Sequence, residues 1–155
     1  MNLVFLDLEA TVLDDWHSAM LLPHNLSKVS KLLATPYDKV GLMSWAVWDK
    51  KDKHTFNTEM RERLELGMMH QFDDTFVWDM QDWSDEFFKH SGKKVSRSDM
   101  FELFGKQELL FAMSRCHPLF RDQNVFLVDD RVEHELSWHS AKNNCSVKML
   151  DIAKM

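Results

Sequence analysis

Acidic residues end two apolar segments of this 155-residue chain. Asp7 and Glu9 follow the first of these segments, and Asp129 and Asp130 follow the second. Several carboxylates at one place suit Mg²⁺, because this hard cation prefers oxygen ligands. A carboxylate can also attack as a nucleophile, while a second one protonates the leaving oxygen. The residue types therefore predict Mg²⁺-dependent chemistry on a negatively charged substrate such as a phosphate ester.

Two further side chains would suit the phosphate group of such a substrate. Ser44 lies in an apolar stretch and offers a hydroxyl donor. Lys106 follows Gly105 at the expected start of a helix, where backbone N–H groups and the helix dipole add positive potential. A lysine there would neutralise charge on the nucleophile and on the phosphate. We therefore expect Lys106 and Ser44 to contribute to the same site as the acids.

Strands and helices alternate along the sequence. Apolar runs predict strands over residues 3–7, 39–48, 75–78, 124–129 and 146–150. Apolar spacings of three or four predict helices over residues 24–33, 57–69, 82–90, 98–104, 106–116 and 132–143. This alternation predicts an α/β domain with a mainly parallel sheet between helical layers. Ligands bind beyond the carboxyl ends of such strands, which is where the acids and Ser44 are expected to meet.

Composition limits the class of protein. Hydrophobic residues make up 45% of the chain and charged residues 28%, which suits one globular domain over residues 1–155. The net charge of −6 disfavours general nucleic-acid binding but suits a protein that holds a divalent cation. Cys116 and Cys145 lack metal-ligand spacing, and the eight histidines show no zinc pattern. We expect a cytoplasmic protein, because neither a signal peptide nor a membrane span is recognisable.

The spacing of these residues resembles the haloacid dehalogenase (HAD) superfamily of phosphatases. The segment Asp7-Leu8-Glu9-Ala10-Thr11 is similar to the family's first motif, Asp-x-Asp-x-Thr, which follows a buried strand. Ser44 resembles the second motif, Lys106 the third, and VFLVDD with Asp129 and Asp130 the fourth. The sequence VDDRVEHELSW is also similar to the 3′-phosphatase domain of phage-type polynucleotide kinases.

The resemblance implies a HAD-like Rossmannoid three-layer sandwich with a minimal cap, confined to residues 12–38. It implies a Mg²⁺-dependent phosphatase that hydrolyses a phosphomonoester, either a nucleotide or a nucleic-acid end, through an aspartyl-phosphate on Asp7. The implied roles are catalysis by Asp7, Glu9 and Lys106, substrate binding by Thr11, Ser44 and Lys106, and metal binding by Asp7, Glu9, Asp129 and Asp130.

Glu9 departs from the motif, which usually has aspartate at this position. One extra methylene moves the carboxyl group by roughly 1.5 Å, and a misplacement of about that size can cost on the order of a hundredfold in rate. Two alternatives therefore stay open. The segment FLDLEAT also resembles the first motif of DEDD-type 3′–5′ exonucleases, where glutamate is normal. A non-catalytic HAD-fold binding protein is the second alternative. A central Asp7 strand in a parallel sheet favours the phosphatase, whereas an antiparallel meander favours the nuclease.

Several other residues are weaker candidates. The lysines in the basic stretch 89–97 compete with Lys106 for a phosphate-facing role, although a solvated turn explains them equally well. Trp16 follows the first motif and could stack on a base, but core packing is the simpler interpretation. Asp14 and Glu133 are either supports for the metal ligands or helix-surface charges.

Overall fold

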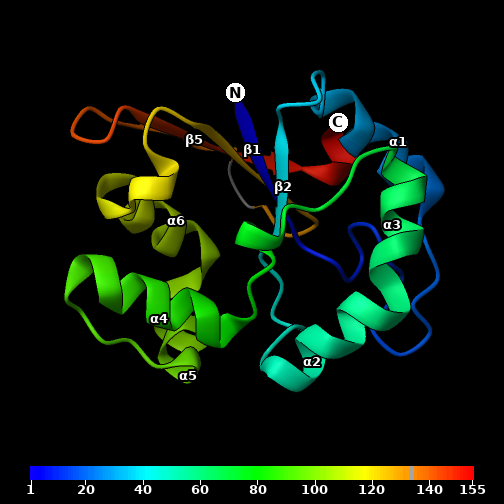
Figure 1. Cartoon of the computed structure of the whole chain (residues 1–155), viewed down its shortest axis with the longest axis horizontal. Helices are drawn as coiled ribbons and strands as arrows, with labels where there is room; N and C mark the ends of the chain where they lie inside the picture. The colour runs from blue at the N-terminus through cyan, green and yellow to red at the C-terminus, as the bar shows by residue number, and fades with distance from the viewer. Residues whose placement is uncertain (133–134) are drawn as a thin grey trace.

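The first apolar run forms the strand on which the rest of the sheet is built. The computed structural model describes residues 1–132 and 135–155. Its strands are β1 (Asn2–Leu6), β2 (Lys39–Leu42), β3 (Asn124–Asp129), β4 (Ser137–Ser140) and β5 (Cys145–Asp151). They form one sheet in the order β2-β1-β3-β5-β4, in which every pair is parallel except β4 with β5 (Figure 1). The predicted mixed α/β fold with a mainly parallel sheet is therefore confirmed, and it is Rossmann-like.

Helical segments connect the strands. They are α1 (Pro23–Leu32), α2 (Lys50–Thr55), η1 (Phe56–Met60), α3 (Arg61–Met68), η2 (Asp74–Phe76), α4 (Met80–Ser91), α5 (Arg97–Asp99), η3 (Met100–Phe104), α6 (Gly105–Cys116), η4 (Pro118–Phe120) and η5 (Ile152–Lys154). The segments η1 and η3 are π-helical, and the other η segments are 3₁₀ turns. Within the described part of the chain, none of these helices combines the length and apolar character that crossing a bilayer requires.

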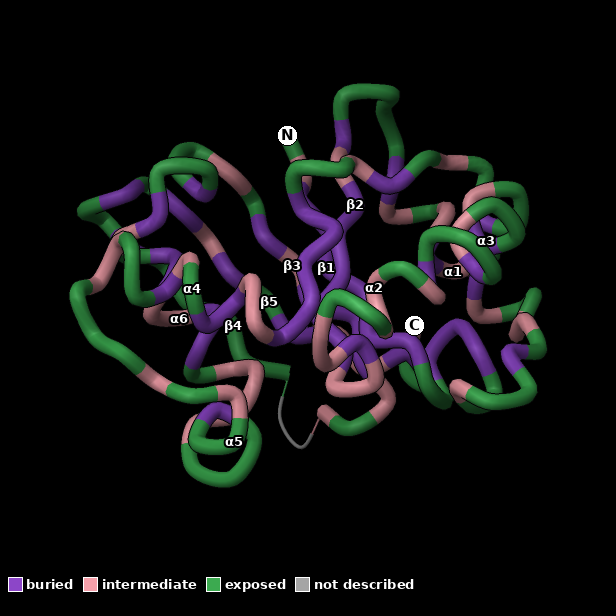
Figure 2. The backbone as a smooth tube through the Cα atoms, turned by 60° about the horizontal axis from the view of Figure 1, so that its bottom comes forward, coloured by how far each residue is buried: buried purple, intermediate pink, exposed green. Residues whose placement is uncertain are grey.

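The sheet separates two hydrophobic cores, because alternate residues of β1 point to opposite faces. Val4 and Leu6 pack with α1 and α3, whereas Leu3 and Phe5 pack with α4 and α6. Figure 1 shows these two helix pairs on opposite sides of the strands. The central strands are buried along their length, as the tube in Figure 2 shows. Burial on both faces explains why β1 reads as a continuous apolar run.

Two strand predictions need correction. The strand expected over 39–48 ends at Leu42, after which the chain turns at Ser44. The strand expected over 75–78 is wrong: this segment is the 3₁₀ turn η2 and the residues after it. The carboxylate of Asp73 accepts a hydrogen bond from the Thr75 N–H at 2.9 Å, which starts the turn. The apolar side chains that suggested a strand, Phe76, Val77 and Trp78, are instead core residues of this turn and of the residues after it.

The helix expected over 132–143 is wrong where the structure describes it. Residues 137–140 form β4, which pairs with β5 through the turn at residues 141–144. Asn144 adopts a left-handed conformation with φ of 46°, and asparagine tolerates this conformation better than most residues. Residues 133–134 of the expected helix, including Glu133, lie outside the described residues.

The segment expected to hold a small cap contains one loop and one helix. Isolated bridges join Glu9 to Leu13 and Leu13 to Leu21, and they fold the loop back on itself. Helix α1 follows and buries Leu26 and Val29 in the core beside the sheet. The loop between β1 and α1 therefore lies next to the strand end that carries Asp7.

Candidate active site

β1 delivers Asp7 to the carboxyl edge of the sheet, and a tight turn follows at once. The N–H groups of the three residues from Thr11 onward all donate to the carbonyl oxygen of Leu8, at 3.0 to 3.1 Å. Ala10 takes a left-handed conformation, with φ of 58°, to make this turn. The turn brings Thr11 back, so that its hydroxyl donates to Asp7 Oδ2 at 3.0 Å. One oxygen of the Asp7 carboxylate is thereby oriented by its own loop.

Lys106 holds the other oxygen of Asp7 and also reaches the neighbouring strand. Its Nζ donates to Asp7 Oδ1 at 2.8 Å and to Asp129 Oδ2 at 2.7 Å. The lysine side chain is only 9% exposed, so these contacts are little screened by solvent. Gly105, with φ of 76°, turns the chain from η3 into α6 and thereby directs Lys106 toward the strand ends.

The two aspartates that end β3 have opposite electrostatic surroundings. Burial alone would raise the pKa of Asp129, but the ammonium of Lys106 and the Arg131 N–H hold that pKa below its ordinary value. Burial, together with the nearby carboxylates of Asp7 and Asp129, raises the pKa of Asp130 to about 6. Asp130 is therefore the acid whose charge is least compensated.

The residues present fit a hard divalent cation. Asp7, Asp129 and Asp130 each offer an oxygen, and these atoms lie within 4.8 Å of one another. Carboxylate oxygens are the ligands that Mg²⁺ prefers. The buried ammonium of Lys106 pairs with Asp7 and Asp129, whereas Asp130 pairs only with the exposed guanidinium of Arg131, at 3.9 Å, among the described residues. Negative charge therefore remains for a cation to balance. Burial is the main cause of the raised pKa of Asp130, and the neighbouring carboxylates of Asp7 and Asp129 add to it.

A cavity of about 670 Å³ opens over these groups. It is lined by Asp7, Lys106 and Ser44, among others. Ser44 is buried and lies just beyond the end of β2, and its Oγ accepts a bond from the Ala46 N–H at 3.3 Å. A hydroxyl that accepts one bond keeps its own hydrogen for a ligand. The volume is in the range of small-molecule binding sites.

Glu9 lines the same cavity, but its carboxylate is engaged elsewhere. Glu9 Oε2 accepts a hydrogen bond from the Trp16 N–H at 2.9 Å. Among the described residues, the cluster of carboxylates whose oxygens lie within 4.8 Å of one another consists of Asp7, Asp129 and Asp130. Glu9 does not belong to it. The structure thus brings Asp7, Ser44, Lys106, Asp129 and Asp130 together. Thr11 was predicted to bind substrate, but it is fully buried, does not line the cavity and contacts Asp7 instead. The Glu9 carboxylate holds the loop beside the site.

Comparisons with protein-family models, curated proteins and solved structures found no match to this chain. The function is therefore inferred from the site itself.

The geometry of the site also shows which of the weaker candidate residues belong to it. Asp14 accepts bonds from Ser18 Oγ and from the Met20 N–H, which makes it a support of its own loop. Lys94 and Arg97 line a different cavity, next to Trp48.

Sequence reasoning missed the aromatic part of the cavity wall. Trp45 and Phe101 line the cavity together with the acids, whereas Trp16 packs against the core on the other face of the sheet. Trp45 directly follows Ser44, so a signal was present at the end of β2. Phe101 gave no such signal, because its position depends on the π-helical segment η3.

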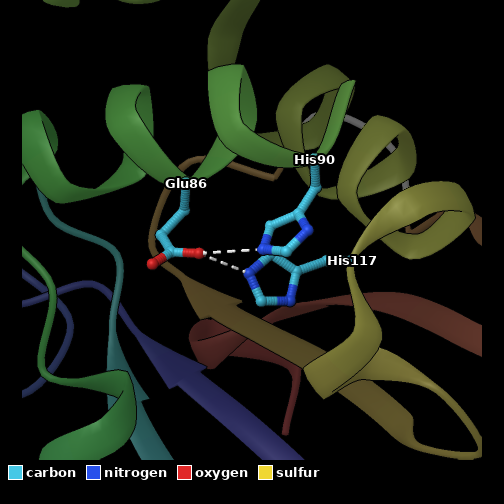
Figure 3. Close-up of side chains that lie close together, drawn as sticks. All are labelled: Glu86, His90 and His117. Atoms are coloured by element: carbon cyan, nitrogen blue, oxygen red, sulfur yellow. Dashed lines mark hydrogen bonds and ion pairs between the residues drawn. The ribbon is translucent and has the colours of Figure 1, made fainter. Parts of the chain in front are cut away.

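A second cluster of possible metal ligands lies between α4 and the junction of α6 with η4. Glu86, His90 and His117 point toward one another (Figure 3), with His117 Nε2 2.7 Å from Glu86 Oε2. His117 Nδ1 accepts a bond from the Leu119 N–H, so the neutral ring carries its proton on Nε2 and donates it to Glu86. A metal-bound histidine normally donates through its second nitrogen, which His117 cannot do here. The cluster is thus a hydrogen-bonded link between helices.

Proposed function

We propose that this protein is a Mg²⁺-dependent phosphomonoester hydrolase with Asp7 as its nucleophile. The observation that carries the proposal is the position of Lys106, whose Nζ bridges Asp7 and Asp129 inside the cavity. A buried ammonium between two carboxylates fixes the orientation of both and offers positive charge to an incoming phosphate. Mg²⁺, held by Asp7, Asp129 and Asp130, would supply further screening between these acids and a dianionic substrate.

The reaction divides into two displacements at phosphorus. An oxygen of Asp7 attacks the phosphorus, the ester P–O bond breaks, and the leaving alcohol takes a proton from Glu9. Glu9 then accepts a proton from water, whose oxygen attacks the aspartyl-phosphate and releases phosphate and free Asp7. Ser44 and Lys106 donate to phosphoryl oxygens throughout. Glu9 Oε2 must release the Trp16 N–H before this oxygen can reach the alcohol.

The position of β1 supports the hydrolase over the exonuclease alternative. β1 lies between β2 and β3 and is parallel to both, whereas the exonuclease reading expects an antiparallel meander from this strand. β3 ends at Asp129 and is followed by Asp130; it has no place in the exonuclease alternative, whereas in the hydrolase these two acids would bind the metal. A non-catalytic binding protein would have the same site without turnover. The measurement of phosphate release distinguishes it from the hydrolase.

The test is phosphate release from a panel of phosphomonoesters, including mononucleotides and 3′-phosphorylated oligonucleotides, with Mg²⁺ present. Asp7→Asn is expected to reduce turnover by about a thousandfold or more, since no carboxylate then attacks phosphorus. The matched control is Asp85→Asn, an exposed acid on α4, which should keep wild-type activity. Chelation of Mg²⁺ should abolish phosphate release by the wild-type protein and by the Asp85→Asn control.

Three outcomes contradict the proposal. Turnover that survives Asp7→Asn would remove Asp7 as the nucleophile. Release of mononucleotides from unmodified DNA would favour the exonuclease. Absence of turnover on every substrate, with Mg²⁺ binding retained, would favour a non-catalytic binding protein.

A further inference from the structure

Two aromatic rings form part of the wall of the Asp7 cavity. The rings of Trp45 and Phe101 have centroids 5.1 Å apart and lie at 88° to one another. Phe101 is 57% exposed, although a phenylalanine ring on a helix is usually turned into a core. Perpendicular rings offer a flat guest both stacking and edge-to-face contact.

Trp48 packs against both rings, and its own ring is covered by Arg97, so it is not free to stack on a ligand. Its ring lies 6.5 Å from Trp45 and 6.5 Å from Phe101. The guanidinium of Arg97 covers it, with Cζ 5.1 Å from the ring centroid, and Arg97 also donates to the Trp48 carbonyl oxygen. The three rings and Arg97 therefore form a packed unit that holds Trp45 and Phe101 at the cavity.

The aromatic wall and the phosphate-facing groups are carried by the same two segments. Trp45 follows Ser44 directly, which places their Cα atoms about 3.8 Å apart. Phe101 lies near the start of η3, about one helical turn before Gly105 and Lys106 at the start of α6. A substrate whose phosphate contacts Ser44 and Lys106 thus has its alcohol portion beside aromatic rings.

We infer that the substrate is a nucleoside monophosphate, whose base stacks against Trp45 and Phe101. This inference rests on the proposed hydrolase activity and specifies the alcohol part of the phosphate ester, which is a nucleoside. A nucleobase is a planar ring that stacks on aromatic side chains regardless of its identity. The cavity of about 670 Å³ accommodates a free mononucleotide. The net charge of −6 disfavours a longer polyanion at this surface.

The experiment compares adenosine 5′-monophosphate with ribose 5-phosphate, in which a hydroxyl replaces the base at C1. The kcat/KM for the nucleotide is expected to exceed that for the sugar phosphate by about 5- to 150-fold, the effect of stacking one base. Trp45→Ala and Phe101→Ala should each lower this ratio severalfold, and Trp45→Phe should retain most of it. Leu103→Ala is the matched control, because Leu103 is an exposed apolar residue of η3 that does not line the cavity.

Binding to the Asp7→Asn protein separates failure of this inference from failure of the proposed activity. Calorimetric titration should give tighter binding of the nucleotide than of ribose 5-phosphate, and Trp45→Ala should remove the difference. That result supports the base site even if no substrate is turned over. Equal kcat/KM and equal affinity for the two ligands would overturn the base site while leaving a phosphatase intact. A short 3′-phosphorylated oligonucleotide that is preferred over both would also overturn it, in favour of a nucleic-acid end.

Discussion

At the scale of single residues, Asp129 and Asp130 show how one neighbour decides the role of an acid. Both end β3, but only Asp129 contacts the Lys106 ammonium. Asp129 is therefore an anion that orients Lys106, whereas Asp130 faces other carboxylates and has a pKa of about 6. Above that pH the charge on Asp130 destabilises the metal-free fold. A cation at the site would relieve this repulsion.

Asp130→Asn should therefore stabilise the metal-free protein at about pH 7.5 and weaken its response to Mg²⁺. The folded-state pKa is raised from 3.8 to about 6, so a stability cost builds up between these pH values and is complete above pH 6, whereas asparagine has no such cost. After allowance for solvent screening of this partly exposed group, the gain is about 1 kcal/mol. Urea unfolding with chelator and with Mg²⁺ measures both effects. A variant that is less stable than wild type in chelator, or equally stabilised by Mg²⁺, would contradict this account of the site.

The sequence was sufficient to locate most of these residues but not to orient them. Asp7, Ser44 and Asp129 could be grouped because parallel strands end at one edge of the sheet. Lys106 could be added because its glycine marked a helix start. The orientation of Glu9 depends on a left-handed residue in the loop, which sequence periodicity does not reveal.

At the scale of elements, β2 depends on a close approach that only glycine permits. A Cβ on Gly41 would lie 2.6 Å from Phe76 Cβ, 2.6 Å from the Phe76 carbonyl oxygen and 2.8 Å from the Phe5 ring. The turn η2 thus packs directly on the backbone of β2, which is an edge strand of the sheet. The same packing explains why Phe76 is buried without being in a strand.

Gly41→Ala should lower the free energy of unfolding by roughly 1–3 kcal/mol, the usual range for overpacking a core. Gly67→Ala on α3 is the matched control, because the atom closest to its new Cβ is the flexible end of the Leu26 side chain. Alanine also favours helix over glycine by about 1 kcal/mol, which offsets the contact in the control. Denaturant unfolding of both variants gives the comparison. Equal stability of Gly41→Ala and wild type would mean that η2 does not pack on β2 as described.

The elements that periodicity predicted wrongly are those whose backbone is determined by neighbours. The apolar residues of 75–78 match a strand, but capping by Asp73 and packing on β2 turn the segment into η2. The segment 137–140 forms β4 because β5 offers a free edge, and the two asparagines at 143 and 144 favour the hairpin turn. The long buried strands and the amphipathic helices needed no such context.

At the scale of the whole molecule, His117 joins four separate parts of one face. Its Nε2 donates to Glu86 on α4, and its Nδ1 accepts the Leu119 N–H of η4. Its carbonyl oxygen accepts a bond from Asn143 in the β4–β5 turn. It also directly follows the end of α6. Charging this buried ring would therefore disturb several contacts at once.

Stability should fall in acid through His117. Burial lowers the pKa of His117 below its ordinary value of 6.5, although the Glu86 carboxylate opposes this and His90 adds to it. A second proton must go to Nδ1, where it would break the bond from Leu119. Because the folded-state pKa is depressed, the contribution of His117 is complete above pH 6.5 and is lost as pH falls below that value.

His117→Asn should therefore flatten the pH dependence of the unfolding free energy between about pH 7.5 and about pH 5. Asparagine keeps an acceptor for the Leu119 N–H but does not titrate. Asp130 changes stability in the opposite direction over part of this range, so both proteins should carry Asp130→Asn and be unfolded in chelator. The histidine protein should lose more stability on acidification than the asparagine protein does. Parallel pH profiles would instead place the acid sensitivity in other groups, and His117 would then be a purely structural link.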